Sequence, residues 1–101
     1  MAERMVVFDE QFDSLERAMS IAAQRQAVIA HNIANAKTPG YEALDFDAEL
    51  LKATARQGNM NVILEDEMAK LANNSVEYSA FVKLLSSKIN ILRTIATQGK
   101  R

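Results

Sequence analysis

The sequence predicts an all-α fold in which two long antiparallel helices form a coiled-coil hairpin with a mostly irregular connector. In both halves of the chain, apolar residues recur with alternating spacings of four and three. Helix-breaking residues are sparse, and apart from Gly99 they lie in the middle, at Pro39, Gly40 and Gly58. The 101 residues suffice for one small domain. We expect a single domain over residues 1–101, with helices at 8–35 and 65–97 and a connector at 36–64.

The helix predicted for residues 8–35 is supported by composition and by periodicity. Ala, Gln, Glu and Arg are frequent in this segment, and they favour helix. A strand would instead need apolar residues at every second position. The residues expected to face the partner helix form a seam, which consists of Phe8, Phe12, Leu15, Met19, Ala22, Gln26, Ile29 and Ile33.

The helix predicted for residues 65–97 begins with Glu65, Asp66 and Glu67, whose carboxylates are favoured by the positive end of the helix dipole. A repeat of about 3.5 residues predicts left-handed supercoiling. The polar seam residues Gln26 and Ser75 either fix the register of the two helices or meet water at a local gap. The seam of this helix consists of Leu64, Met68, Leu71, Ser75, Tyr78, Val82, Leu85, Ile89, Leu92 and Ala96.

The connector is expected to begin with a tight turn. Pro39 and Gly40 suit the central positions of a type II turn, because Pro fixes φ and Gly tolerates a positive φ. A short helix is predicted from Asp45 or Asp47 towards Arg56, with Gly58 as its stop. Its apolar residues are Phe46, Leu50 and Leu51. Residues 61–63 are expected to form at most a marginal extended segment.

A second apolar line on the last helix predicts an interaction surface. This assembly surface consists of Phe81, Leu84, Ile91 and Ile95, with Lys88 interrupting it. One partner helix covers a single face, and each large apolar side chain left in water forgoes about 1.5–3 kcal/mol of burial. We therefore expect self-association or docking to another protein. The alternative is that the connector covers this line within a small three-element domain.

Composition and motifs argue against catalysis and ligand binding. A net charge of −1 gives no electrostatic reason to expect nucleic acid. The chain has no Cys, and His31 is its one His, so the usual ligands of a metal site are missing. No Gly-rich phosphate loop occurs, and no apolar run reaches the length of a membrane span or a signal peptide. We expect no enzyme activity, cofactor, metal or small-molecule substrate.

Residues 32–41 resemble the N-terminal signature of bacterial flagellar rod, hook and related axial proteins. The motif positions are Asn32, Asn35, Thr38, Pro39, Gly40 and Tyr41. Asn32 and Asn35 also suit a helix C-cap. Residues 45–47, 58–59 and 73–75 narrow the resemblance to the FlgB-type family of proximal rod proteins, with the C-type sister family as the alternative. Typical members have a further segment where residues 56–58 join the two parts directly here.

The resemblance implies an axial-type domain that serves as a structural subunit of the proximal rod of the flagellar basal body. Such subunits assemble helically for torque transmission and motility. The implied partners are other rod subunits, a rod-base adaptor and the export gate. The implied location is the periplasm-spanning rod, reached by type III export without a cleaved signal peptide.

Residues 8–12 resemble the short aromatic motif by which rod and hook subunits contact the export gate, which implies that role for Phe8 and Phe12. The competing hypothesis is a cytoplasmic coiled-coil adaptor or chaperone. Such a protein would bind a partner helix along the assembly surface. It would have no need of the turn at residues 38–41.

Overall fold

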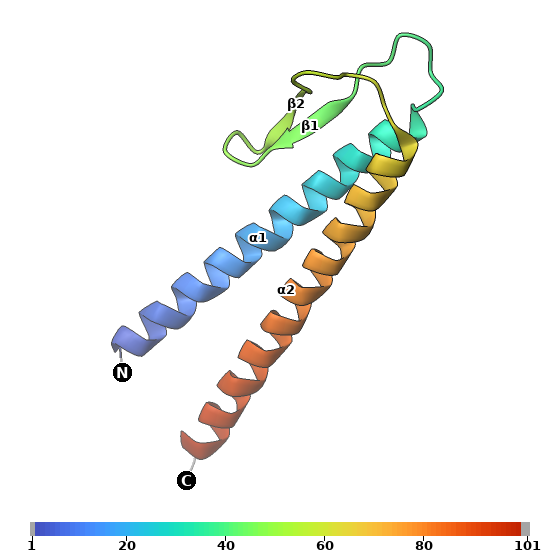
Figure 1. Ribbon diagram of the computed structural model, residues 1–101. Coiled ribbons are helices and arrows are strands. Elements are labelled where there is room, and N and C mark those ends of the chain that lie inside the picture. The colour runs from blue at the N-terminus through green and yellow to red at the C-terminus, as the bar shows by residue number, and fades with distance from the viewer. Residues whose placement is uncertain (1, 100–101) are drawn as a thin grey trace.

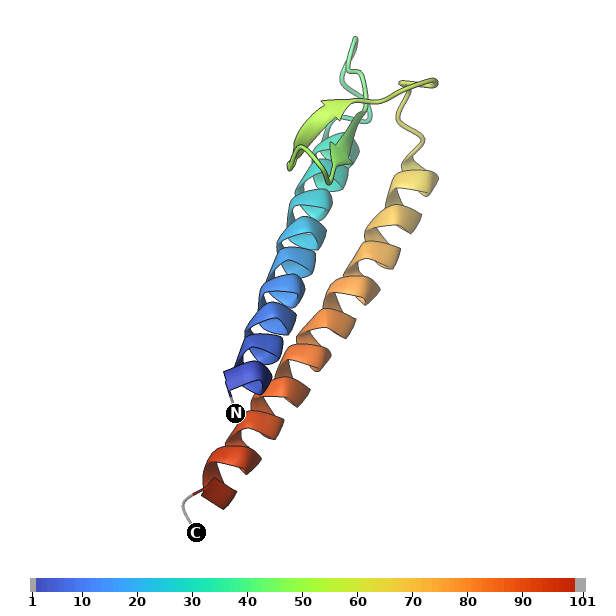
Figure 2. The same ribbon diagram turned by 90° about the vertical axis from the view of Figure 1, so that its left-hand side faces the viewer.

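The computed structural model describes residues 2–99, with the side chains of residues 9–98, and consists of two long helices and a β-hairpin. The elements are α1 (Ala2–Ala34), β1 (Leu44–Asp47), β2 (Lys52–Ala55) and α2 (Leu64–Gly99). The helices lie side by side and antiparallel, and the hairpin lies on the side of α1 away from α2 (Figures 1 and 2). The radius of gyration is 18.7 Å, whereas a globular domain of this size has about 13 Å. The molecule is therefore a rod-like hairpin.

Both predicted helices are present and longer than expected. α1 begins at residue 2 rather than 8, because neither Gly nor Pro interrupts the chain before Pro39. It ends at Ala34, where the backbone tightens and the Asn35 amide donates to both the His31 and the Asn32 carbonyls. α2 starts with acidic residues in its first turn, as the helix dipole favours. Left-handed supercoiling of the pair stays a prediction.

The inward face of α1 contains three predicted seam residues at intervals of one heptad. Leu15, Ala22 and Ile29 are buried, and the seam residues Phe12 and Ile33 are half-buried. Since side chains seven residues apart lie on one face of a helix, this line forms the inward face of α1 over residues 15–29.

The inward face of α2 differs from the predicted seam at most positions. The seam residues Leu71, Leu85 and Leu92 are half-buried, as expected. Between them the least exposed residues lie one position earlier than predicted, at Glu67, Asn74, Phe81 and Lys88. The predicted seam residues that are exposed instead are Leu64, Met68, Ser75, Tyr78, Val82, Ile89 and Ala96.

The physical reason for this shift is that polar side chains of α2 find partners on the inward side. Asn74 donates to the Ala22 carbonyl at 2.7 Å. Lys88 donates to Gln11 on α1. Hydrophobic periodicity assigns such residues to solvent, but a buried polar group is tolerated once it is hydrogen-bonded.

The connector contains a β-hairpin, so the predicted short helix is wrong. β1 and β2 pair antiparallel, with Leu44 opposite Ala55 and Asp47 opposite Lys52. In β1, Leu44 and Phe46 are half-buried while Asp45 is exposed. This alternation suits a strand, and an isolated helix of this length would lack the tertiary packing that stabilises short helices.

The loop of the hairpin is held by an aspartate and carries an unusual leucine. Asp47 Oδ1 accepts hydrogen bonds from the backbone amides of Glu49 and Leu50 at 2.9 and 3.0 Å. Leu51 has a φ of 54°. This left-handed conformation costs an L-residue roughly 1–2 kcal/mol. The side chains of Leu50 and Leu51 are nevertheless 59% and 44% exposed.

The predicted turn after α1 is confirmed. The Tyr41 amide donates to the Thr38 carbonyl at 3.2 Å, and Gly40 has a φ of 78°, as a type II turn requires. Gly58 also has a positive φ, but it belongs to a bend between β2 and α2 and ends no helix. Residues 61–63 contain no strand.

The apolar core is small. Within the described side chains, the buried apolar residues are Leu15, Ala22, Ile29 and Ala43, and none of them lies on α2. Because full burial of a large apolar side chain contributes about 1.5–3 kcal/mol, this core provides little stabilisation for so long a molecule. In the part of the chain that the structure describes, neither helix has the combination of length and hydropathy that a membrane span needs.

Candidate functional site

Asn32 lies at the centre of a polar network that joins α1, the turn, β1 and α2. Its side chain has no exposed surface. Nδ2 donates to the Leu44 carbonyl at 2.8 Å and to Glu67 Oε2 at 3.3 Å, while Oδ1 accepts from the Leu44 amide at 2.9 Å and from the Tyr41 hydroxyl at 2.6 Å. These four bonds use the full capacity of the amide. One side chain therefore fixes the positions of four segments.

This geometry also fixes the protons around Tyr41. The Leu44 amide can only donate, so the atom of Asn32 that receives it is the oxygen. The Tyr41 hydroxyl must then donate to Asn32, and His31 Nδ1, which lies 2.8 Å from that hydroxyl, must carry a proton. Burial raises the pKa of Tyr41, and the negative charge of Glu67 adds to the rise, whereas Arg56 opposes it. Tyr41 is therefore held as the neutral donor.

Glu67 is a fully buried carboxylate on α2. Arg56 Nη2 donates to its Oε1 at 2.6 Å, and Lys70 Nζ lies 3.4 Å from the same oxygen. Burial raises the pKa of Glu67, but hydrogen bonds from Arg56 and Asn32 and the charges of Arg56 and Lys70 outweigh burial, so the pKa lies below its ordinary value. Glu67 is therefore ionised. Arg56 also donates to Asp45 Oδ1 at 2.9 Å, which links the two strands to α2.

The other motif residues close the C-terminal end of α1. Asn35 Nδ2 donates to the His31 carbonyl at 2.9 Å, and Thr38 Oγ1 donates to Asn35 Oδ1 at 3.2 Å. The His31 carbonyl thus accepts from both the backbone amide and the side chain of Asn35, and Thr38 holds that side chain in place. The exposed residues Pro39 and Gly40 complete the turn. The six predicted motif positions thus lie together in one region. We call this region, with the hydrogen-bonded side chains of Arg56 and Glu67, the junction.

Sequence reasoning missed Arg56 as a member of this junction and assigned Glu67 only to the helix dipole. A signal for Glu67 exists in the sequence. Read from Glu67, the spacings of four and three lead through Leu71 and Asn74 to Phe81, so that two polar residues fall on an inward heptad line. A buried carboxylate on such a line requires a cation, and Arg56 precedes it by 11 residues.

Asn74 is the polar residue buried between the helices. Its Nδ2 donates to the Ala22 carbonyl and, at 3.2 Å, to Gln26 Oε1. Ser75 Oγ reaches the same Gln26 oxygen at 3.5 Å. Gln26 and Ser75, the polar residues of the two predicted seams, therefore contact each other. Asn74 Oδ1 is buried without a hydrogen-bond partner.

The predicted assembly surface is largely exposed. Leu84, Ile91 and Ile95 are 52%, 48% and 52% exposed. Phe81 is half-buried, and it lines a groove between the helices together with Leu15 and Leu84.

The two predicted export-contact residues differ in what the structure describes. Phe12 is half-buried and lines a different groove, beside Met19 and Tyr78. The side chain of Phe8 lies outside the described residues.

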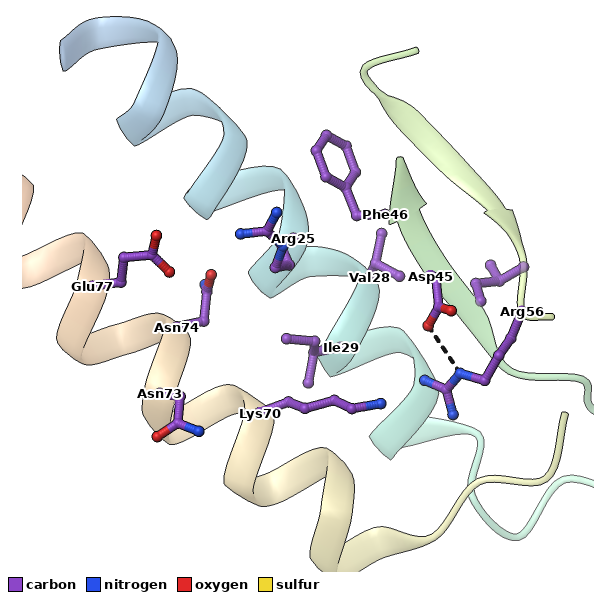
Figure 3. A pocket seen from close by; sticks show the side chains of 11 residues that line it. Arg25, Val28, Ile29, Asp45, Phe46, Arg56, Lys70, Asn73, Asn74 and Glu77 are labelled. Carbon is purple, nitrogen blue, oxygen red and sulfur yellow. Dashed lines mark hydrogen bonds and ion pairs between the residues drawn. The ribbon is translucent and has the colours of Figure 1, made fainter. Parts of the chain in front are cut away.

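A further groove lies between α1, α2 and β1, with a volume of about 410 Å³. Figure 3 shows Phe46 extending from β1 beside Val28 of α1, with Asn73 and Glu77 on α2 across from them. Charged side chains line the groove as well, among them Arg25, Lys70 and Glu77. The groove is therefore apolar in part and bears both signs of charge.

The polar side chains of the junction have a structural role. Among the described side chains, no three His, Asp or Glu residues are placed to hold a metal ion. The carboxylate of Glu67 and the amide of Asn32 are occupied by partners from the chain itself.

Comparison with known proteins places the chain among flagellar rod proteins. Residues 12–41 match the family described as flagella basal body rod protein. The flagellar basal body rod protein FlgB of Bacillus subtilis is 31% identical over 129 positions, covering 95% of this chain and all of that protein. The FlgB protein of Proteus mirabilis is 28% identical over 87% of this chain and 94% of its own length. The FlgB protein of Escherichia coli is 54% identical over 43 residues, which is 41% of this chain.

The match to the Bacillus subtilis protein runs over 129 positions, although this chain has 101 residues. That relative therefore has residues without a counterpart here.

Proposed function

This chain belongs to the FlgB family of flagellar basal body rod proteins, and we propose that it is built into the proximal part of the rod by helical assembly with other axial subunits. The role of structural rod subunit, expected from the sequence, is confirmed by these relatives. We infer that the chain has no catalytic role, since the polar groups of the junction are used to hold the fold.

The observation that carries the proposed assembly is the imbalance between buried and exposed apolar surface on α2. Leu84, Ile91 and Ile95 are about half exposed, while no apolar side chain among the described residues of α2 is buried. Large apolar side chains exposed along one flank of a helix mark an interaction surface. We propose that neighbouring rod subunits cover this face, and that the same surface supports self-association.

The long helices and the junction are suited to a subunit that bears mechanical load. The network around Asn32 fixes the hairpin to both helices, so that a force applied to one element passes to the others. A contact between two different surfaces of identical subunits propagates as a helix unless its rotation closes a ring. We propose that torque passes along the periplasm-spanning rod through such contacts.

The rod-base adaptor and the export gate are proposed as further partners. We propose that the gate contacts Phe8 and Phe12 before the two helices pair. Phe12 is half-buried beside Met19 and Tyr78 in the folded chain, so this contact fits a subunit whose α1 is still unpaired.

A double substitution on the assembly surface tests the proposed function. In a flagellated bacterium that depends on this chain, Leu84→Ser with Ile91→Ser should abolish motility and leave no rods in purified basal bodies. The purified variant should keep the circular dichroism of the parent, because both side chains are about half exposed.

The matched control is Met68→Ser. Met68 is 56% exposed on the other flank of α2, and its replacement should preserve motility. Normal rods built from the double variant would refute the proposed assembly.

A further inference from the structure

We propose that the tip of the β-hairpin, with Leu50 and Leu51 flanked by Glu49 and Lys52, docks into the groove between α1, α2 and β1 of a second copy of this chain. This inference rests on the proposed function, since it names one contact through which copies would assemble. It concerns a surface different from the assembly surface of α2.

The conformation of the tip favours a binding role. Leu51 adopts a φ of 54°, which Gly or Asn adopts more readily than a leucine does. Both leucines keep much of their surface in solvent, since Leu50 is 59% and Leu51 is 44% exposed. Strained backbone that carries exposed apolar side chains is typical of a binding element. The tip is also short and fixed by the two hydrogen bonds to Asp47, so it loses little conformational entropy on docking.

The groove is partly apolar and accepts leucine side chains. Its apolar lining includes Val28 and Phe46, which are only half-buried in the isolated chain. Figure 3 shows α1, with Arg25, Val28 and Ile29, running between Phe46 of β1 and the α2 residues Asn73 and Glu77. Leucine side chains that enter this groove would bury their own surface together with that of Val28 and Phe46.

The charges of the tip and of the groove are complementary. On the tip, Glu49 and Lys52 bracket the two leucines, and in the groove Arg25 and Glu77 stand on opposite helices. Among the described residues none of these four makes an intrachain ion pair. A docked tip can place Lys52 beside Glu77 and Glu49 beside Arg25.

A second copy is the occupant, because the tip cannot reach the groove of its own chain. Residues 44–46 of β1 form part of the groove wall, and the loop begins two residues later. The hairpin also lies on the side of α1 away from α2 (Figures 1 and 2), whereas Asn73 and Glu77 belong to α2. Tip and groove are different surfaces, so the contact is heterologous and leaves a free tip and a free groove at its two ends.

Disulfide cross-linking tests the contact directly, because the chain contains no Cys. Full-length Leu50→Cys protein is mixed with a size-tagged Asn73→Cys protein, and the mixture is oxidised. A mixed disulfide dimer should form at least several-fold more than with the control Ser87→Cys, an exposed position about 21 Å further along α2. A yield equal to that of the control would overturn the proposal.

A charge exchange gives a second readout. Lys52→Glu and Glu77→Lys should each reduce the cross-linking yield several-fold, and the two substitutions combined, one in each cross-linking partner, should restore it. Failure to restore the yield would overturn the assigned orientation of the tip.

Different outcomes refute the tip-groove contact and the proposed function. Copies that associate through α2 without any mixed tip-groove disulfide would refute this contact and leave the proposed function standing. If the mixed disulfide forms but the variant with Leu84→Ser and Ile91→Ser still builds normal rods, the tip-groove contact stands and the proposed function is refuted.

Discussion

Arg56, the residue that follows β2, places its guanidinium 2.6 Å from the fully buried carboxylate of Glu67 on α2. This ion pair fastens the hairpin to the second helix, while Asn32 fastens it to the first. The connector is therefore part of the folded unit, and its pairing determines how the two helices meet at the junction.

Removal of the arginine should strongly destabilise the fold. In Arg56→Ala, Glu67 keeps Asn32 and the partly exposed Lys70 but loses its closest cation, and a buried charge deprived of its partner costs about 3–5 kcal/mol. Urea unfolding followed by circular dichroism measures the loss. The control Lys70→Met removes an exposed cation at 3.4 Å and should cost less than about 1 kcal/mol. Equal losses in the two variants would contradict the role of Arg56.

Acid should lower the stability of the fold because Glu67 becomes protonated. The pKa of Glu67 is lower in the folded chain than its ordinary value of 4.5, so the folded state binds this proton less tightly than the unfolded state does. Its contribution is complete above pH 4.5 and is lost as the pH falls through the lower folded-state pKa. Urea midpoints between pH 7 and pH 3 should therefore fall less steeply for Glu67→Gln than for the parent. Identical slopes would show that Glu67 is not the titrating group.

Asn32 should tolerate neither truncation nor charge. Asn32→Ala leaves the backbone groups of Leu44 without partners in a buried region, and each unsatisfied group costs about 1–3 kcal/mol. Asn32→Asp places a second carboxylate beside Glu67, to which the amide now donates at 3.3 Å. Both variants should lose about 3 kcal/mol in urea unfolding. Asn35→Ala, which removes bonds at an exposed helix end, should lose about 1 kcal/mol.

The helical part of the fold follows from the sequence because its causes are local. The alternating spacings of four and three in both halves of the chain, and the absence of Gly and Pro from residues 1–38 and 59–98, suffice to predict two helices. The turn at Pro39 and Gly40 is predictable for the same reason, since each residue type restricts its own φ.

The hairpin and the inward face of α2 depend on partners distant in sequence. Asp45 and Asp47 are good helix caps in isolation, and only pairing with residues 52–55 and contact with α1 make a strand of residues 44–47. Likewise, Glu67 and Asn74 resemble surface residues until Arg56, Asn32 and Ala22 are placed beside them. Periodicity ranks residues by hydropathy and cannot weigh a hydrogen bond across 52 residues.

Asn74 offers a test of what the polar contact between the helices contributes. Its Oδ1 is buried without a partner, so Asn74→Leu removes an unsatisfied acceptor and adds apolar contact with the buried Ala22 and Ile29. The Ala22 carbonyl keeps its bond within α1 and Gln26 is half-buried, so the replacement leaves no fully buried group unpaired, and we expect a gain of about 1–2 kcal/mol in urea unfolding. Ser75→Leu, at an exposed neighbouring position, should change stability by less than about 0.5 kcal/mol. Because single polar residues between helices also specify register, the stabilised variant should form additional oligomers in sedimentation velocity runs. A variant that is less stable than the parent would show that the bonds to Ala22 and Gln26 outweigh the unsatisfied oxygen.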